Sequence, residues 1–226
     1  MDPVLKIIIL ALFFVTSESL AGKSQKNRDV VPIKDNIHCL LVADLFSYGK
    51  NESAYAQISL TLIDRHLLHE IRFIKFLAHR FFEGTEVSTA GIATYGYVPV
   101  LPININSALD RMAVTYEEFS KHLTPATQLR NTNEHSNTAQ AIEYINLFKD
   151  LKGRANCLVF LSAQKKPKTL PRLFVTKEWK TVIAVGFDGA DLRSILTSPQ
   201  GIAMQVPYVF KDKDVRRVAD TILKSF

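Results

Sequence analysis

The chain has 226 residues, of which 47% are hydrophobic, and it contains only 9 glycines and 9 prolines. These values fit one globular domain with a full apolar core and exclude a low-complexity chain. The formal net charge is +6, which favours acidic partners such as sulfated glycans, anionic membranes or acidic proteins, although a merely basic soluble protein fits as well.

The first 21 residues have the features of a secretory signal peptide. Lys6 precedes an apolar run over residues 7–15, and Ser19-Leu20-Ala21 offers small side chains at the −3 and −1 positions of a cleavage site. The run is too short to span a bilayer, so an uncleaved membrane anchor is the less favoured alternative. No later stretch is long and apolar enough to span, and we expect a secreted, extracellular chain with no membrane span. Cleavage would raise the net charge from +6 to +7 by removing Lys6, Asp2 and Glu18.

The remaining chain is predicted to have a flexible lead-in over residues 22–36 and one domain over residues 37–226. The domain opens on the apolar run Cys39-Leu40-Leu41-Val42-Ala43, which stops at Asp44. Such a run predicts a strand buried on both faces, as in a parallel sheet. Asp44 then lies at the carboxyl end of that strand, where open α/β sheets bind ligands. The sequon at Asn51 predicts N-glycosylation of a surface loop.

Helices and strands alternate along the rest of the chain. Apolar residues at spacings of three and four predict a long helix over residues 54–82, ended by Gly84. A strand is predicted over residues 87–95. Its antiparallel partner over residues 97–105 contains Pro99 and Pro102, which favour the edge of a sheet. Further helices are predicted at 115–125, 138–151 and 214–223, with a short one ending near 197, and further strands at 157–161, 181–187 and 206–210.

This alternation predicts an α/β three-layer sandwich, with a mostly parallel central sheet, one antiparallel edge strand and helices on both faces. Cys39 and Cys157 each open a predicted central strand. An oxidising compartment permits a disulfide between them if the two strands are neighbours. Adjacent parallel strands are an unfavourable geometry for a disulfide, so two buried free thiols are the alternative. Of the two, we favour the disulfide.

The order of these motifs resembles the von Willebrand factor type A (VWFA) domain over about residues 37–226. The opening strand runs into an acid, as in that family. Residues 73–77 resemble the family's first long helix, and residues 87–95 resemble its second strand. Residues 137–142, Asn-Thr-Ala-Gln-Ala-Ile, resemble the Asn-Thr-x-x-Ala-Leu start of a later helix, and residues 181–192 resemble a late strand with its loop. The resemblance implies a Rossmann-like VWFA fold.

The family's metal-ion-dependent adhesion site implies a set of ligand positions in this chain. The site is built from Asp-x-Ser-x-Ser after the first strand, a Thr before a later helix and an Asp after the fourth strand. Asp44 matches the first acid, but the two Ser positions fall on Phe46 and Tyr48. The Thr position falls on Ser136, and the late Asp position falls on Ala163, which has no oxygen ligand. Because magnesium requires near-octahedral oxygen ligation, the resemblance implies a degenerate site, and we expect no metal and no cofactor.

We therefore expect a secreted, non-enzymatic adhesion module that binds an extracellular protein or an acidic glycan without a metal, and that does not bind nucleic acid. The candidate binding surface is the strand-end edge of the sheet, where aromatic and basic residues would suit such partners. Its residues are Asp44, Phe46, Tyr48, Ser136, Lys165, Lys166, Lys168 and Arg172. In the alternative, Phe46 and Tyr48 only pack over the vacated metal site, and the lysines form a solvated loop.

Two other functions stay open. A secreted α/β hydrolytic enzyme would need a nucleophile and a base, and Ser162 and His135 would have to act with Asp44. The sequence has no Gly-x-Ser-x-Gly elbow and no glycine-rich phosphate loop to support that arrangement. The other possibility is a structural component of an extracellular complex, which no sequence feature distinguishes from a binding module.

Overall fold

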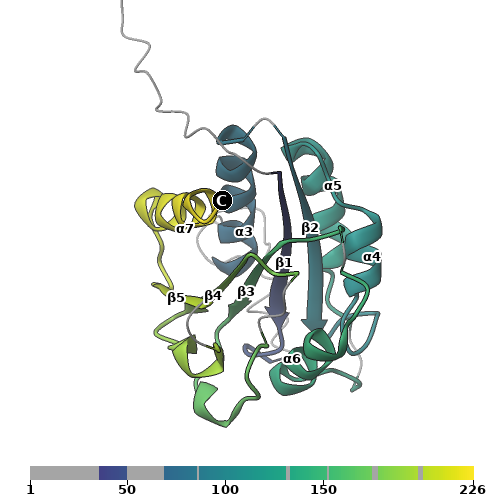
Figure 1. Ribbon diagram of the computed structural model, residues 1–226. Coiled ribbons are helices and arrows are strands. Elements are labelled where there is room, and N and C mark those ends of the chain that lie inside the picture. Colours follow the sequence, from purple (N-terminus) through teal and green to yellow (C-terminus); the bar gives the residue numbers. More distant parts are fainter. Residues whose placement is uncertain are drawn as a thin grey trace, which may run out of the picture. The chain divides into compact units, whose positions relative to one another are not determined.

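The computed structural model describes residues 36–49, 69–85, 87–130, 133–151, 153–174, 178–197 and 201–226, all within a compact unit that runs from Val31 to Phe226 (Figure 1). The predicted signal peptide, nearly all of the lead-in, the sequon at Asn51 and the first part of the predicted helix over residues 54–82 lie outside the described residues. In the part of the chain that is described, no helix is both long and apolar enough to cross a membrane.

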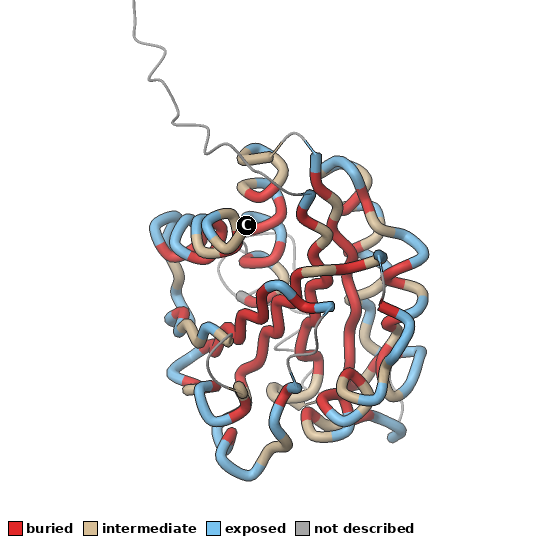
Figure 2. The backbone as a smooth tube through the Cα atoms, viewed as in Figure 1, coloured by how far each residue is buried: buried red, intermediate tan, exposed pale blue. Residues whose placement is uncertain are grey.

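Within the described residues, five strands form one sheet in the order β2-β1-β3-β4-β5, and every neighbouring pair is parallel (Figure 1). The strands are β1 (Ile37–Leu45), β2 (Ser88–Gly96), β3 (Cys157–Ser162), β4 (Thr181–Phe187) and β5 (Gly201–Val206). The three central strands are short apolar runs that are buried almost throughout, as expected where layers cover both faces of a sheet (Figure 2).

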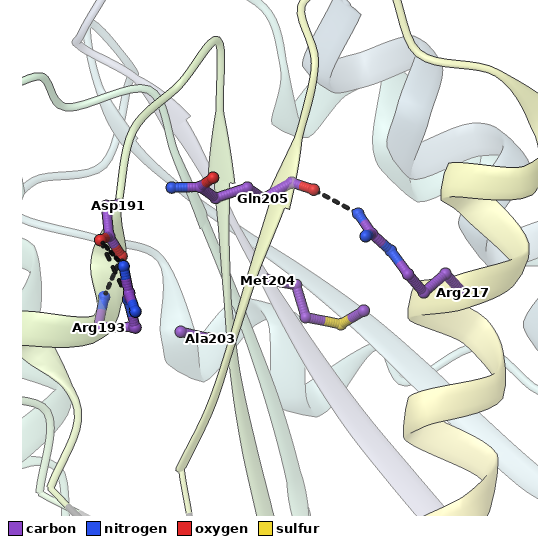
Figure 3. Close-up of a pocket in the computed structure, with 6 residues that line it drawn as sticks. All are labelled: Asp191, Arg193, Ala203, Met204, Gln205 and Arg217. Carbon is purple, nitrogen blue, oxygen red and sulfur yellow. Dashed lines mark hydrogen bonds and ion pairs between the residues drawn. The ribbon is translucent and has the colours of Figure 1, made fainter.

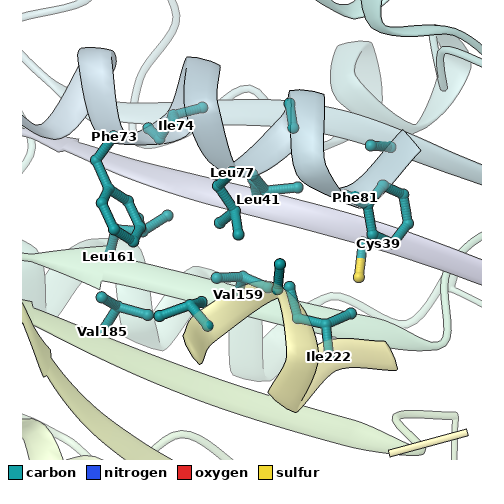
Figure 4. Close-up of a cluster of buried hydrophobic side chains, with 14 of the residues drawn as sticks. Cys39, Leu41, Phe73, Ile74, Leu77, Phe81, Val159, Leu161, Val185 and Ile222 are labelled. Atoms are coloured by element: carbon teal, nitrogen blue, oxygen red, sulfur yellow. The ribbon is translucent and has the colours of Figure 1, made fainter. Parts of the chain in front are cut away.

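Helices cover both faces of this sheet, so the predicted three-layer arrangement is present. One face packs against α3 (His69–Glu83), α5 (Tyr116–Ala126) and α7 (Asp212–Lys224). The other packs against α4 (Ile105–Asp110), α6 (Thr138–Leu147) and the 3-10 turn η2 (Leu192–Ile195). Alternate side chains of β1 serve the two cores. Leu41 meets Leu77 of α3 on the first face (Figure 4), whereas Leu40 and Val42 point to the second.

The predicted antiparallel edge strand is wrong, because the sheet is entirely parallel. Residues 97–104 form an irregular segment that leads into α4, a helix missed from the sequence. Pro99 and Pro102 have no backbone N–H group, so this segment has too few donors for a continuous ladder. Two other boundaries also move. The last strand ends at Val206 instead of starting there, and α6 ends at Leu147.

A disulfide joins the two central strands. Cys39 of β1 and Cys157 of β3 are directly paired in the parallel register, and their Cα atoms are 4.4 Å apart. Both side chains are fully buried in the core between the sheet and α3, where Figure 4 shows Cys39. The bridge therefore fixes the register of the strands that carry Asp44 and Ser162 at their carboxyl ends.

Candidate functional site at the strand ends

The candidate site lies where β1 and β3 end side by side. The strand order is 2-1-3-4-5, so the chain connections from β1 and from β3 run in opposite directions. In open sheets of this kind, ligands bind beyond the carboxyl ends of these two strands. Asp44 comes from the end of β1, and Ser162 comes from the end of β3. The fold thus brings the acid predicted from the sequence to the edge expected for a ligand site.

The carboxylate of Asp44 is saturated by donors from the protein itself, and the residue is only 1% exposed. Its Oδ1 accepts the backbone N–H groups of Phe46 at 2.8 Å and Ser47 at 2.9 Å. Its Oδ2 accepts the hydroxyls of Ser47 and Ser162, each at 2.5 Å, and the N–H of Ala163 at 3.3 Å. Asp44 therefore holds the turn after β1 and ties it to the end of β3.

Ser136 is also committed to the protein. Its hydroxyl donates to the carbonyl of Pro102 and accepts the N–H of Gly96 at 3.4 Å, and the side chain is buried. The adjacent Asn137 begins α6 with a capping box, in which its side chain and Gln140 satisfy each other's backbone N–H groups. Ser136 thus anchors the irregular segment after β2 to the start of α6.

The side chains at the family's metal-ligand positions do not fit a magnesium ion. Both carboxylate oxygens of Asp44 accept hydrogen bonds from protein groups, and the hydroxyl of Ser136 donates to a carbonyl. Ala163 contributes an N–H group to Asp44 where the family's pattern would place a carboxylate. Magnesium needs several oxygen ligands at about 2.0–2.1 Å, and this set offers none that is uncommitted. Among the described residues, no group of three or more His, Cys, Asp or Glu side chains is gathered to hold a metal.

A second buried acid, Glu70, supports the site from α3. Its Oε1 accepts the backbone N–H of Asp44 at 2.7 Å, and its Oε2 is buried with no hydrogen-bond partner in the structure described. Burial, together with the negative charge of Asp44, raises the pKa of the Glu70 carboxyl well above its ordinary value of 4.5. Sequence reasoning missed this residue. Its signal was an acid that shares the apolar face of α3 with Phe73, Ile74 and Leu77, at spacings of three, four and seven.

This raised pKa predicts a pH dependence of stability. Between pH 4.5 and the pKa in the folded state, the folded chain binds more protons than the unfolded chain, so stability falls as the pH rises through this range. Glu70→Gln keeps an acceptor for Asp44 and has no proton to lose. We expect it to melt at a higher temperature than wild type at pH 8, with the difference vanishing below about pH 4.5. Thermal melts across this range measure the effect.

The matched control is Glu117→Gln, which changes an exposed acid on α5. It should leave the shape of the pH profile unchanged. A Glu70→Gln profile parallel to that of wild type would contradict the raised pKa of the Glu70 carboxyl.

Three rings form an aromatic stack at the same edge. The ring centroid of Phe46 lies 5.3 Å from that of His135 and 6.1 Å from that of Tyr97, and both pairs are stacked. The ring centroids of Tyr97 and His135 are 4.9 Å apart. Phe46 and Tyr97 are half-buried, whereas His135 is exposed. Tyr48, the other aromatic residue expected at this edge, does not join the stack. It is half-buried beside Leu45, its hydroxyl is buried with no partner in the described structure, and burial raises its pKa.

The basic residues predicted at this edge are exposed but partly neutralised. Lys165 donates to the carboxylate of Asp188 at 2.6 Å. Lys166, Lys168 and Arg172 surround the short 3-10 turn η1 (Pro167–Thr169), and all three are exposed. The positive charge of Lys168 contributes to lowering the pKa of Asp191, after the larger effect of hydrogen bonds from Arg193.

The serine, histidine and aspartate considered for a hydrolase are only partly brought together. Ser162 contacts Asp44, as described above, but its side chain is 0% exposed. The hydroxyl of Tyr95 on β2 donates to the hydroxyl of Ser162 at 3.3 Å. His135 instead stacks on Phe46, and its Nδ1 lies 3.1 Å from the carbonyl of Asn133. The buried hydroxyl of Ser162 thus serves the Asp44 network.

Taken together, the strand ends form a site of the doubly wound α/β class, closed by its own hydrogen bonds and surrounded by aromatic and basic side chains. The solved structures that this chain resembles include von Willebrand A domains. The VWA domain of SpRpn10 has a TM-score of 0.48 and 10% identity, over 80% of this chain and 94% of that one. The von Willebrand factor type A structure from Catenulispora acidiphila has a TM-score of 0.46 and 11% identity, over 84% and 42%.

Proximal thread matrix protein 1 from the mussel byssus has a TM-score of 0.47 and 10% identity, over 85% of this chain and 48% of that one. The chain thus spans less than half the length of this protein and of the Catenulispora chain. The TM-scores lie below 0.5 and the identities near 10%, so the likeness is one of overall architecture and establishes neither a family nor a function for this chain. No protein-family model matches the sequence, and no curated protein matches it.

Proposed function

We propose that the chain is a secreted, non-enzymatic interaction module of the VWFA type that binds an extracellular protein at the strand-end edge, without a metal. The observation that carries this proposal is the stack of Phe46, Tyr97 and His135 beside the saturated Asp44. Aromatic side chains are enriched in protein interfaces, where a half-buried ring offers large contact area at little cost in conformational entropy.

Apolar neighbours favour a protein over a glycan as the partner. The segment that Ser136 anchors through Pro102 carries Val100 and Leu101, which are 51% and 40% exposed. Lys165 is already paired with Asp188, and Lys168 interacts electrostatically with the carboxylate of Asp191. A sulfated glycan would need several uncompensated cations, whereas a protein surface would use the rings and the apolar side chains together. Binding of an acidic glycan is therefore the alternative outcome of the test below.

The disulfide supports the proposed location. Bridges such as Cys39–Cys157 persist in oxidising compartments and are rare in the cytosol, which agrees with a signal peptide over residues 1–21. The burial of Ser162 supports the non-enzymatic role, because a nucleophile must meet its substrate and a base. Glycosylation at Asn51 belongs to the same proposal.

The test measures binding of the chain to an array of purified extracellular proteins and to heparin, in EDTA and in magnesium. We expect binding to at least one protein that is equal in both buffers and weakened about tenfold by His135→Ala, since a ring at an interface contributes about 1–2 kcal/mol. The matched control is His79→Ala on α3. His79 also packs on a ring, that of Tyr116 at 5.0 Å, but lies away from the strand ends.

Two results would overturn this function. One is binding that requires magnesium. The other is binding to heparin alone that falls with Lys166→Glu but not with His135→Ala, because it would assign the edge to an acidic glycan.

A further inference from the structure

The two edges of the sheet differ in how their outward backbone groups are covered. At the β2 edge, Ala90 and Ala113 exchange two backbone hydrogen bonds of 2.9 Å, and the side-chain oxygen of Asn104 accepts the N–H of Thr94 at 2.7 Å. At the β5 edge, the described residues supply one hydrogen bond, from the guanidinium of Arg217 to the carbonyl of Gln205. An edge strand left open in this way is a template for another extended chain.

The register shows which groups of β5 face outward. The carbonyl of Val206 accepts the N–H of Asp188, so it faces β4. Because backbone groups alternate between the two sides of a strand, those of Gly201, Ala203 and Gln205 face away from β4. The contact of Arg217 with Gln205 from the outer side agrees with this assignment. Gly201 and Ala203 therefore present N–H and C=O groups that no described residue pairs.

Two hollows with a cationic lining adjoin this edge. The first, of about 380 Å³, runs along β5 and is lined by Asp191, Arg193, Ala203, Met204, Gln205 and Arg217 (Figure 3). The second, of about 340 Å³, runs along α7 and is lined by Lys213, Arg216, Arg217, Asp220, Thr221 and Lys224. Together they carry five cations and two acids, of which Arg193 is paired with Asp191. Arg216 is paired with Asp212, and no described carboxylate pairs with Lys213, Arg217 or Lys224. Arg217 belongs to both hollows, and its recorded partner is a neutral carbonyl.

We propose that an acidic peptide segment of a partner protein binds to β5 as a sixth, extended strand. Its backbone would pair with Gly201 and Ala203, and acidic side chains at alternate positions would face α7. There Arg217 would exchange the neutral Gln205 carbonyl for a carboxylate, which forms a stronger hydrogen bond with a guanidinium. Main-chain pairing gives such a contact its affinity, and the alternate side chains give it specificity. This surface lies at the side of the sheet and is independent of the strand-end edge.

Charge argues against a second copy of the chain as the occupant. Two β5 edges placed together would bring their Arg217 and Lys213 side chains close, and like charges at short range oppose pairing. An acidic strand meets no such repulsion. The proposal therefore commits to a partner peptide and leaves self-association as an outcome of the test.

The test uses the purified chain and three fluorescein-labelled hexapeptides, Glu-Val-Glu-Val-Glu-Val, its Lys-Val analogue and its Glu-Pro analogue. Fluorescence anisotropy should show that the Glu-Val peptide binds about tenfold or more tightly than either analogue, since one lacks the charge and the other lacks donors for a ladder. On binding, the amides of Gly201 and Ala203 should gain protection from hydrogen exchange. Arg217→Glu should weaken binding about tenfold.

Two further variants sharpen the test. Ala203→Pro removes an outward N–H without removing a bond to β4, and it should weaken the Glu-Val peptide to the level of the Glu-Pro analogue. Lys121→Glu makes the same charge change as Arg217→Glu on the exposed side of α5, next to the opposite edge strand, and should have no effect. Circular dichroism establishes that each variant is folded, and the Arg217→Glu comparison decides the matter if Ala203→Pro is not.

Three outcomes would overturn the proposal. The first is no binding of the Glu-Val peptide at about 1 mM. The second is equal binding of the Glu-Pro analogue, which would reduce the contact to charge alone. The third is a concentration-dependent dimer that Arg217→Glu enhances. None of them bears on the aromatic stack at the strand ends, so the two proposals fail separately.

Discussion

Asp44→Ala is expected to destabilise the chain by about 3 kcal/mol or more, because it leaves five buried or half-buried donors without an acceptor. The N–H groups of Phe46, Ser47 and Ala163 are fixed by the backbone and cannot turn to other partners. The hydroxyls of Ser47 and Ser162 lose their acceptor as well. Asp44→Asn should cost about half as much, since the amide retains one acceptor oxygen. Urea unfolding followed by circular dichroism measures both.

The matched control is Asp150→Ala, which removes an exposed acid paired with Arg154 at the surface. A surface pair of this kind contributes little, so its loss should stay within about 0.5 kcal/mol. If Asp44→Ala cost no more than Asp150→Ala, Asp44 would not be the structural acceptor described above.

Removal of the disulfide is expected to cost about 3–5 kcal/mol, as for other long loops closed by a bridge. Cys39 and Cys157 are 118 positions apart, so the bridge restricts more than half of the unfolded chain. Cys39→Ala with Cys157→Ala is the suitable variant, because alanine adds no polar atom to a fully buried position. Urea unfolding of the variant, beside that of the wild-type chain in dithiothreitol, measures the loss.

The wild-type chain supplies the control for this experiment. Unfolded in dithiothreitol, it should match the double variant, and in the native state the buried sulfurs should resist the reductant until the chain opens. Two free thiols labelled by iodoacetamide after denaturation of the untreated chain would contradict the bridge.

Much of the fold follows from local patterns in the sequence. The apolar runs that begin at Cys39, Cys157 and Thr181 are the three central strands, because a strand covered on both faces needs continuous apolar side chains. The strand predicted over residues 97–105 is absent. The β-branched side chains of this segment fit an edge strand, but Pro99 and Pro102 lack the backbone N–H groups that a strand ladder needs. The short helix α4 has too few turns to show a period.

The site was predictable in position but not in its connections. The place of Asp44 at the end of a strand was evident, since an acid abruptly ends an apolar run. Its partners Ser162 and Ala163 lie more than a hundred residues away and are brought to it only by the pairing of β1 with β3. Glu70 was missed for the same reason. An acid on an apolar helix face is recognised as buried only when the group it accepts from is known.

The aromatic stack depended on long-range contacts as well. Phe46 and Tyr48 were expected at the same edge of the sheet, either as binding residues or packed over the vacated metal site. The ring of Phe46 meets Tyr97 and His135 from two later loops. Tyr48 turns instead toward the small core beside Leu45. Alternation along the turn after β1 does not determine these directions, because the turn is held by Asp44 and has no strand geometry.

The most direct test of the central claim is a magnesium titration of the 15N-labelled chain followed by NMR. Protein donors occupy the Asp44 carboxylate, and we propose that the strand-end edge binds its partner without a metal. The amides of Phe46, Ser47 and Ala163, which all donate to Asp44, should keep their chemical shifts as magnesium is added after chelator treatment. Saturable shifts of these three amides that Asp44→Asn abolishes would contradict the account.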